Sequence, residues 1–163
     1  MCEYCGCQDI PAIAELTAEH DRLRELSREL VDACEACDLD AARDLAARML
    51  TVLWPHTSVE EDGLFPALAA EFGDYLGTLQ TEHRRIHAAL ENLFFVAPPA
   101  YWPENTIAAL DLLFEHILKE QDGLFPAALA TLDAHGWESV IAARLRATAG
   151  DASLVRSAGL LAR

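Results

Sequence analysis

Two peptides of this chain repeat the same arrangement of histidine and glutamate. HTSVEEDGLFP begins at His56, and HILKEQDGLFP begins at His116, sixty positions later. In a helix, residues four apart lie on the same face, so His56 and Glu60 can contact one ion together. The same holds for His116 and Glu120. A buried carboxylate needs a positive partner, and imidazole with carboxylate is a ligand set for iron, manganese or zinc. The repeat therefore predicts a buried cation site.

Three further histidines extend the repeat to most of the chain. The segment EHDRLREL, which contains His20, aligns with EHRRIHAAL, which contains His83 and His87. Arg24 occupies the position in the first copy that His87 occupies in the second. If the two copies close around one axis, the inward-facing groups are numerous enough for two metal ions. These groups are His20, His56, Glu60, His83, His87, His116 and Glu120.

Because the two copies differ, we expect the two metal ions to have unequal ligand sets. The ion with fewer ligands keeps an open position for a small ligand such as dioxygen, peroxide or nitric oxide. The spacing of the residues does not identify that ligand. The expected ligands are His83, His87 and His116 for one ion, His20 and His56 for the other, and Glu60 and Glu120 as bridges between the two.

Apolar residues at spacings of three and four predict four long helices. The predicted ligands continue the apolar faces of these helices. The three prolines of residues 97–105 predict a non-helical connection. Each DGLFP peptide predicts a helix stop, an apolar plug and a restart. The helices are expected over residues 11 to about 37, about 40 to 62, about 75 to 96, and Asn105 or Thr106 to about 122.

Composition favours an all-α fold. Alanine, leucine and glutamate dominate, and β-branched residues are few. A length of 163 residues with 52% apolar residues suits one domain with its own core. Four amphipathic helices pack most simply as an antiparallel four-helix bundle. The expected parts are an N-terminal arm at residues 1–10, the bundle at 11–130 and a C-terminal extension of one or more helices at 131–163.

The charge of the chain bears on its partners and its location. The formal net charge is −15, from 27 acidic and 12 basic residues. Such a charge repels phosphate backbones and anionic membrane surfaces, so neither nucleic acid nor membrane is expected as a partner. No apolar run is long enough to span a bilayer, and the first residues lack the pattern of a secretory signal. We expect a cytoplasmic protein.

Five cysteines form two groups, CEYCGC with Cys2, Cys5 and Cys7, and CEAC with Cys34 and Cys37. Cys34 lies about 35 Å along the first predicted helix, whereas the arm reaches back about 14 Å to Cys7 and about 31 Å to Cys2. These lengths argue against one zinc site shared by both groups. Cys34 and Cys37 are expected as small buried thiols at one end of the bundle. CEYCGC could bind a soft metal, oxidise reversibly or link chains.

In its histidine and glutamate residues, the chain resembles the hemerythrin-like family, also called the HHE cation-binding domain. The resemblance covers about residues 12–130. It implies a four-helix bundle that holds two iron ions in an oxo- or hydroxo-bridged, non-haem di-iron centre. Members bind dioxygen reversibly, sense oxygen or nitric oxide, handle iron or decompose peroxide. The resemblance assigns the family's motif to His20, His56 with Glu60, His83 with His87, and His116 with Glu120.

One position departs from the oxygen-carrying members of that family. They place the last acid five residues after its histidine, where this chain has Gln121, and the acid here is Glu120. Metal binding survives this change, but the case for oxygen carriage is weaker. We therefore expect a di-iron protein that binds or senses dioxygen or nitric oxide, with a possible link to iron homeostasis. The alternatives are a peroxide-decomposing or ferroxidase-like oxidoreductase, and a metal-buffering or structural zinc protein. The histidine-rich set favours binding, because ferritin-like oxidases use more carboxylates and a Glu-x-x-His spacing.

Overall fold

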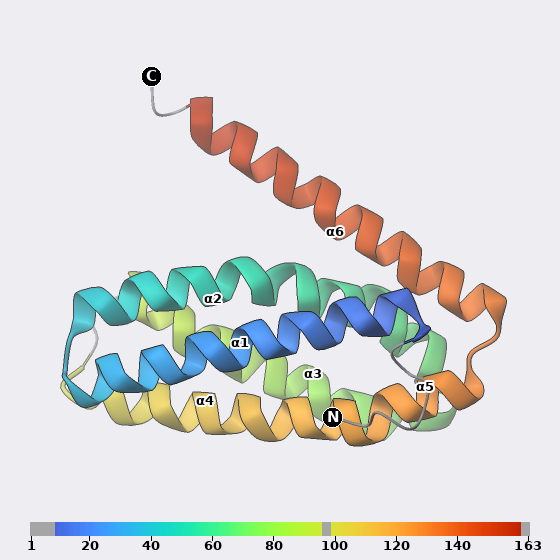
Figure 1. Ribbon diagram of the computed structural model, residues 1–163, viewed down its shortest axis with the longest axis horizontal. Coiled ribbons are helices and arrows are strands. Elements are labelled where there is room, and N and C mark those ends of the chain that lie inside the picture. The colour runs from blue at the N-terminus through green and yellow to red at the C-terminus, as the bar shows by residue number, and fades with distance from the viewer. Residues whose placement is uncertain (1–8, 96–98, 161–163) are drawn as a thin grey trace.

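The computed structural model describes residues 9–95 and 99–160, and these residues form helices without any strand. The all-α class is therefore confirmed. The helices of residues 11–35, 39–59, 65–95 and 102–119 lie side by side along the long axis, and the helix of residues 134–160 extends away from them (Figure 1). The elements are α1 (Pro11–Glu35), α2 (Leu39–Val59), η2 (Glu60–Leu64), α3 (Phe65–Phe95), α4 (Trp102–Lys119), η3 (Glu120–Leu124), α5 (Phe125–Thr131) and α6 (Ala134–Leu160), where η marks a π-helix.

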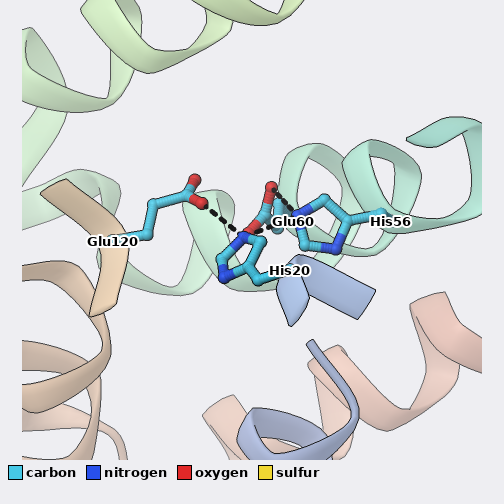
Figure 2. A group of neighbouring side chains, drawn as sticks. All are labelled: His20, His56, Glu60 and Glu120. Carbon is cyan, nitrogen blue, oxygen red and sulfur yellow. Dashed lines mark hydrogen bonds and ion pairs between the residues drawn. The ribbon is translucent and has the colours of Figure 1, made fainter. Parts of the chain in front are cut away.

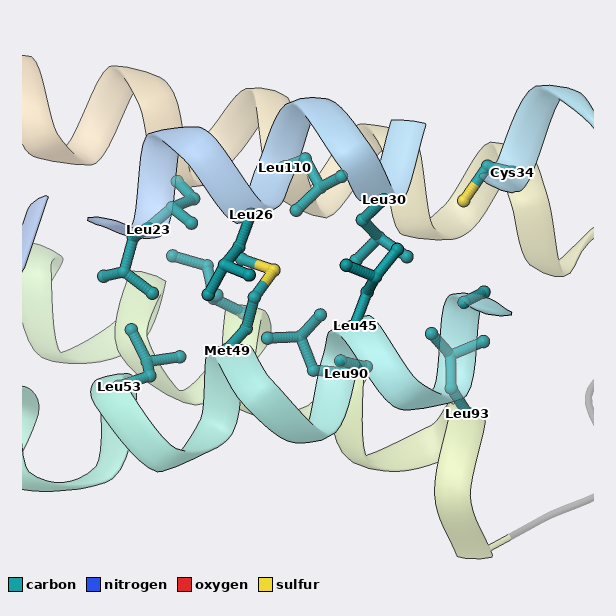
Figure 3. Packing of buried hydrophobic residues seen from close by; sticks show 14 of the residues in the cluster. Leu23, Leu26, Leu30, Cys34, Leu45, Met49, Leu53, Leu90, Leu93 and Leu110 are labelled. Carbon is teal, nitrogen blue, oxygen red and sulfur yellow. The ribbon is translucent and has the colours of Figure 1, made fainter. Parts of the chain in front are cut away.

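Two apolar clusters fill the bundle, one on each side of the predicted ligands. The Met49 cluster packs leucines from α1, α2, α3 and α4 (Figure 3). The Phe125 cluster contains residues of the other end of the bundle and reaches α6 through Val140. On α1, His20 falls between Leu16 of the Phe125 cluster and Leu23 of the Met49 cluster. The histidines therefore form a polar layer between the Met49 cluster and the Phe125 cluster.

Local signals in the sequence account for the starts of the helices. Pro11 stands in the first turn of α1, where its missing N–H removes no hydrogen bond. Asp38 caps α2, because its side chain accepts a hydrogen bond of 3.0 Å from the N–H of Ala41. The predicted start of the fourth helix at Asn105 or Thr106 is wrong. α4 begins at Trp102, because the proline that follows it is also tolerated in a first turn.

The DGLFP peptides do not stop the helices, which corrects the sequence-based interpretation. The first three residues of each peptide lie in a π-helical turn, and its phenylalanine begins the next α-helix directly. The N–H of Phe65 donates to the carbonyl of Glu60, five residues earlier. Phe125 and Glu120 are related in the same way. A proline follows each phenylalanine, and we attribute the wider turn to the space that its ring needs next to the preceding turn.

Helix α3 is kinked near its start. Phe72 has φ −123° and ψ 16°, outside the helical region. The predicted restart after the first DGLFP peptide and the predicted helix from about Tyr75 are therefore the two parts of α3 on either side of this kink. Among the described residues, no helix combines the length and the apolar character needed to cross a membrane.

The cysteines of CEAC differ in exposure. Cys34 is buried near the end of α1, as expected. Cys37 is exposed, and its φ of 53° places it in a left-handed turn after the helix, so the expectation of a second buried thiol is wrong. Cys37 lies beyond the end of α1 at Glu35, so its side chain does not continue the apolar face of that helix. The predictions for Cys2, Cys5 and Cys7 concern residues outside the described part of the chain.

Candidate metal centre

Six of the seven predicted ligands meet in the middle of the bundle. They form two groups that share both glutamates, and within each group one donor atom per residue lies within 4.8 Å of the others. Every one of the six residues is buried. Figure 2 shows the first group, with side chains from α1, from η3 and from the continuous segment of α2 and η2 pointing toward one another. The groups are His20, His56, Glu60 and Glu120, and Glu60, His83, His116 and Glu120.

The distances within each histidine pair fit metal coordination. The Nε2 atoms of His20 and His56 are 3.1 Å apart, and those of His83 and His116 are 2.9 Å apart. A metal ion bound at about 2.1 Å from each donor holds neighbouring donors about 3 Å apart. The spacing of each pair therefore suits two ligands of a single ion.

Each glutamate reaches both histidine pairs. Oε2 of Glu120 is 3.1 Å from Nε2 of His20, and its Oε1 is 3.0 Å from Nε2 of His116. Oε2 of Glu60 is 3.5 Å from Nε2 of His56 and 3.3 Å from Nε2 of His83. Apart from these histidines, the buried carboxylate oxygens have no hydrogen-bond partner among residues 9–95 and 99–160. Buried carboxylates without other donors are suited to metal ions, and this pair is placed to serve two.

A second set of carboxylates orients three of the imidazoles. Nδ1–H of His56 donates to Glu19 at 2.9 Å, and Nδ1–H of His116 donates to Glu82 at 2.9 Å. A histidine that donates from Nδ1 presents Nε2 as the ligand atom, and such partners tune metal affinity. Glu19 and Glu82 are not among the residues predicted from the sequence. Each directly precedes a predicted ligand histidine in its copy, in EHDRL and EHRRI, and that shared position was the available signal.

His83 receives its orienting carboxylate from a different place. Its Nδ1–H donates to Oε1 of Glu61 at 2.8 Å. The corresponding position in the second copy is Gln121, which instead accepts a hydrogen bond of 3.0 Å from Arg24. Nδ1 of His20 has no hydrogen-bond partner among the described residues. The two groups therefore contain the same residue types, two histidines with both glutamates, but differ in the residues that hydrogen-bond to the Nδ1 atoms of their histidines.

The electrostatics of the centre favour positive charge beside its carboxylates. Burial alone would raise the pKa of Glu120, but His116 and His20 hold that pKa well below its usual range. Burial acts to lower the pKa of His116, but the attraction of the Glu120 carboxylate is stronger than this effect, so the pKa of His116 is raised. Burial has the larger effect at His20, whose pKa is lowered. A metal cation bound at these atoms can supply the positive charge that the buried carboxylates require.

His87 lies outside both groups. Its Nε2 is 3.2 Å from Oγ1 of Thr57, and its ring lies 4.7 Å from that of Trp54. Burial and the neighbouring charge of His83 lower the pKa of His87 to about 4, so its ring is neutral at pH 7. The structure does not bring His87 to the six central residues, and its assignment as a seventh ligand stays a prediction.

A surface cavity of about 460 Å³ adjoins the second group. Trp54, Thr57, Glu61, His83 and His87 are among the residues that line it. Solvent therefore reaches the immediate neighbourhood of His83, one of the predicted ligands, from this side of the bundle.

Comparison with protein families agrees with the geometry of the centre. Residues 12–128 match the hemerythrin HHE cation-binding domain, which covers all six central residues. The corresponding comparisons find no significant match to a curated protein or to a solved structure. A buried histidine and glutamate cluster and a match over most of the chain lead to the same conclusion. The chain belongs to the hemerythrin HHE cation-binding domain family.

Proposed function

We propose that this protein binds two iron ions in the centre of its bundle and uses them to bind or sense dioxygen or nitric oxide. The observation that carries the proposal is the position of the two glutamates. Glu60 and Glu120 each lie within 3.5 Å of a nitrogen from both histidine pairs. Two ions held in this way would share both carboxylates as bridges.

The donor set supports iron as the metal. Imidazole and carboxylate suit iron, manganese and zinc, and carboxylate-bridged pairs of redox metals occur in helical bundles. Iron would supply the reversible redox chemistry that binding of a diatomic ligand requires. The protein's own contribution is to hold the imidazoles in one orientation through Glu19, Glu61 and Glu82. It also keeps the centre between two apolar clusters that exclude water.

We also propose that α1, α2, α3 and α4 form an antiparallel four-helix bundle. Only residues 36–38 separate α1 from α2, a connection too short for a parallel return. The cavity beside His83 and His87 supports entry of a small ligand from solvent. A larger substrate could not reach the centre, because its six central residues are at most 3% exposed. We also retain the cytoplasm as the proposed location.

Anaerobic reconstitution with ferrous iron tests the function. The reconstituted protein is mixed separately with dioxygen, nitric oxide and peroxide, and its absorption spectrum is followed. A coloured adduct that reverses under vacuum or argon supports binding or sensing. Oxygen evolution from peroxide, or steady oxidation of added ferrous iron, would instead show an enzyme. Tight binding of zinc in place of iron, with no adduct, would indicate a buffer or a structural site. The double variant His56→Ala/His116→Ala, which breaks both pairs, is the control.

A further inference from the structure

Helix α6 lies outside the part of the chain that matches the family, yet it contacts the metal centre's supporting residues. Nη1 and Nη2 of Arg144 lie 2.6 and 3.0 Å from the two carboxylate oxygens of Glu19. The same carboxylate accepts the hydrogen bond from Nδ1 of His56. A continuous chain of charged contacts therefore runs from α6 to a predicted metal ligand.

The other half of the centre has the same arrangement without any contribution from α6. There, Nζ of Lys119 contacts Glu82, and Glu82 accepts the hydrogen bond from Nδ1 of His116. Lys119 directly precedes Glu120, and the corresponding residue of the first copy is Val59, which is buried. The first copy thus lacks its own cation at this position, and Arg144 supplies one from α6.

A close packing contact holds α6 against the π-turn that begins with Glu60. A Cβ atom added to Gly63 would lie 2.8 Å from Cβ of Ala143 and 3.0 Å from Cα of Val140. At the equivalent Gly123, the one described atom within 4 Å of an added Cβ would be the hydroxyl oxygen of Tyr75, at 3.6 Å. Gly63 therefore permits the approach of α6, and the second π-turn has no such neighbour.

We propose that α6 is a positioning element for the half of the centre formed by His20 and His56. Arg144 fixes the carboxylate of Glu19, which in turn fixes the orientation of His56 toward the metal. Docking of α6 and metal binding in this half are then coupled, and each strengthens the other. The inference rests on the proposed two-metal centre and adds a C-terminal control over one of its two ions.

Ferrous titration under anaerobic conditions tests the coupling in variants that isolate each half. In a His116→Ala background, His20 and His56 form the remaining complete pair. Adding Arg144→Gln there should weaken ferrous binding about tenfold to hundredfold, as for loss of an orienting partner. In a His56→Ala background, the same change should leave the affinity unaltered. Equal affinity with and without Arg144→Gln in the His116→Ala background would overturn the proposal.

Two further variants separate positioning from general damage to the fold. Arg144→Lys should recover most of the lost affinity, because a lysine performs this role in the other half. Arg146→Gln removes a nearby arginine of α6 that donates an exposed hydrogen bond of 3.4 Å to the carbonyl oxygen of Asp62, and it should have no effect. Failure of Arg144→Lys to recover the affinity, or equal losses for Arg144→Gln and Arg146→Gln, would contradict the role of Arg144.

Hydrogen exchange measures the coupling from the side of α6. Ferrous iron should slow amide exchange of residues 137–149 in the wild-type protein, and this protection should be lost in Arg144→Gln. Gly63→Ala should push α6 away and weaken the same ion, whereas Gly123→Ala should not. Metal-independent exchange of α6 in the wild-type protein would refute the coupling.

A readout that needs no metal distinguishes failure of this inference from failure of the proposed function. In metal-free protein, the ring Nδ1–H of His56 should give a protected proton resonance, because Glu19 accepts its hydrogen bond. Arg144→Gln should broaden or remove that signal, and Arg146→Gln should not. If the wild-type protein bound no ferrous iron, the proposed two-iron function would be refuted. The Nδ1–H signal of His56 would still show whether Arg144 positions that ring.

Discussion

The ring of His20 stacks on the ring of Phe125, with centroids 5.6 Å apart and planes inclined by 10°. Phe65 and His83 repeat this contact at 5.7 Å and 10°. Each phenylalanine belongs to the DGLFP peptide of one copy and covers a histidine of the other copy. Each copy therefore supplies an aromatic ring that covers a predicted ligand of the other copy.

Phe125→Leu tests the value of this stacking. Leucine keeps the apolar contact but removes the flat ring that holds His20, so we expect a loss of about 1 kcal/mol in the free energy of unfolding. Chemical denaturation measured by circular dichroism gives this value. Phe114→Leu, at a position that is 52% exposed, is the control and should change the stability by less than about 0.5 kcal/mol. Equal effects of the two changes would show that the stacking contributes nothing specific.

Glu60→Ala and Glu120→Ala test the bridging role of the glutamates. Each carboxylate lies between both histidine pairs, so either change should leave a folded bundle with less than about half of the wild-type iron. Metal analysis after reconstitution and desalting measures the content, and circular dichroism checks the fold. Wild-type metal content in either variant would rule out a bridge at that residue.

The two histidines of the third helix should behave differently. His83 lies in the second group of central residues, whereas Nε2 of His87 contacts Thr57. We expect His83→Ala to lose about one of two metal ions and His87→Ala to lose clearly less, because only the first removes a central imidazole. Metal content per chain is the measurement, with Arg24→Ala as the matched change in the first copy. A loss in His87→Ala as large as that in His83→Ala would restore His87 to the ligand set.

Metal binding should raise thermal stability. An ion that binds only the folded chain adds about 2.7 kcal/mol when its free concentration is a hundredfold above its Kd. We therefore expect the Tm, measured by calorimetry under anaerobic conditions, to rise with ferrous iron and to fall again with a chelator. The double variant His56→Ala/His116→Ala should show little of this rise. A Tm that is the same with and without metal would contradict binding to the folded centre.

Cys34 and Cys37 should differ in reactivity. Burial raises the pKa of Cys34 to about 11, although a hydrogen bond with Thr106 acts in the opposite direction. Because the thiolate is the reactive form, alkylation of Cys34 at pH 8 should be slow and should accelerate as the pH approaches 11. Exposed Cys37 should react faster, and urea should remove the difference. Peptide mass spectrometry gives the rate at each cysteine, and equally fast labelling of both in the folded protein would contradict the buried environment of Cys34.

The same shift has a consequence for stability. The folded chain keeps the proton of Cys34 to a higher pH than the unfolded chain, whose thiol has an ordinary pKa of 9.0. This contribution to stability is complete below pH 9 and is lost as the pH rises through 11.

Much of the architecture and most of the centre follow from the sequence alone. Apolar residues at helical spacing predict the helices, because burying one face is what stabilises a helix in a bundle. The clustering of these side chains could be predicted because a histidine and a glutamate four residues apart share a face, as His56 and Glu60 do. The doubled motif then indicates two groups. These features depend on the spacing of residues along the chain, which the sequence shows directly.

Other features were decided only by packing between distant segments. The π-turns at Glu60 and Glu120 could not be read from DGLFP, since the same letters also suit a helix end. The pairing of His83 with Glu61 and the approach of Arg144 to Glu19 join residues from separate helices. No local pattern encodes such contacts. They exist because the bundle closes around buried carboxylates and histidines, whose charge and hydrogen bonds must be satisfied by whichever polar groups the folded chain brings within reach.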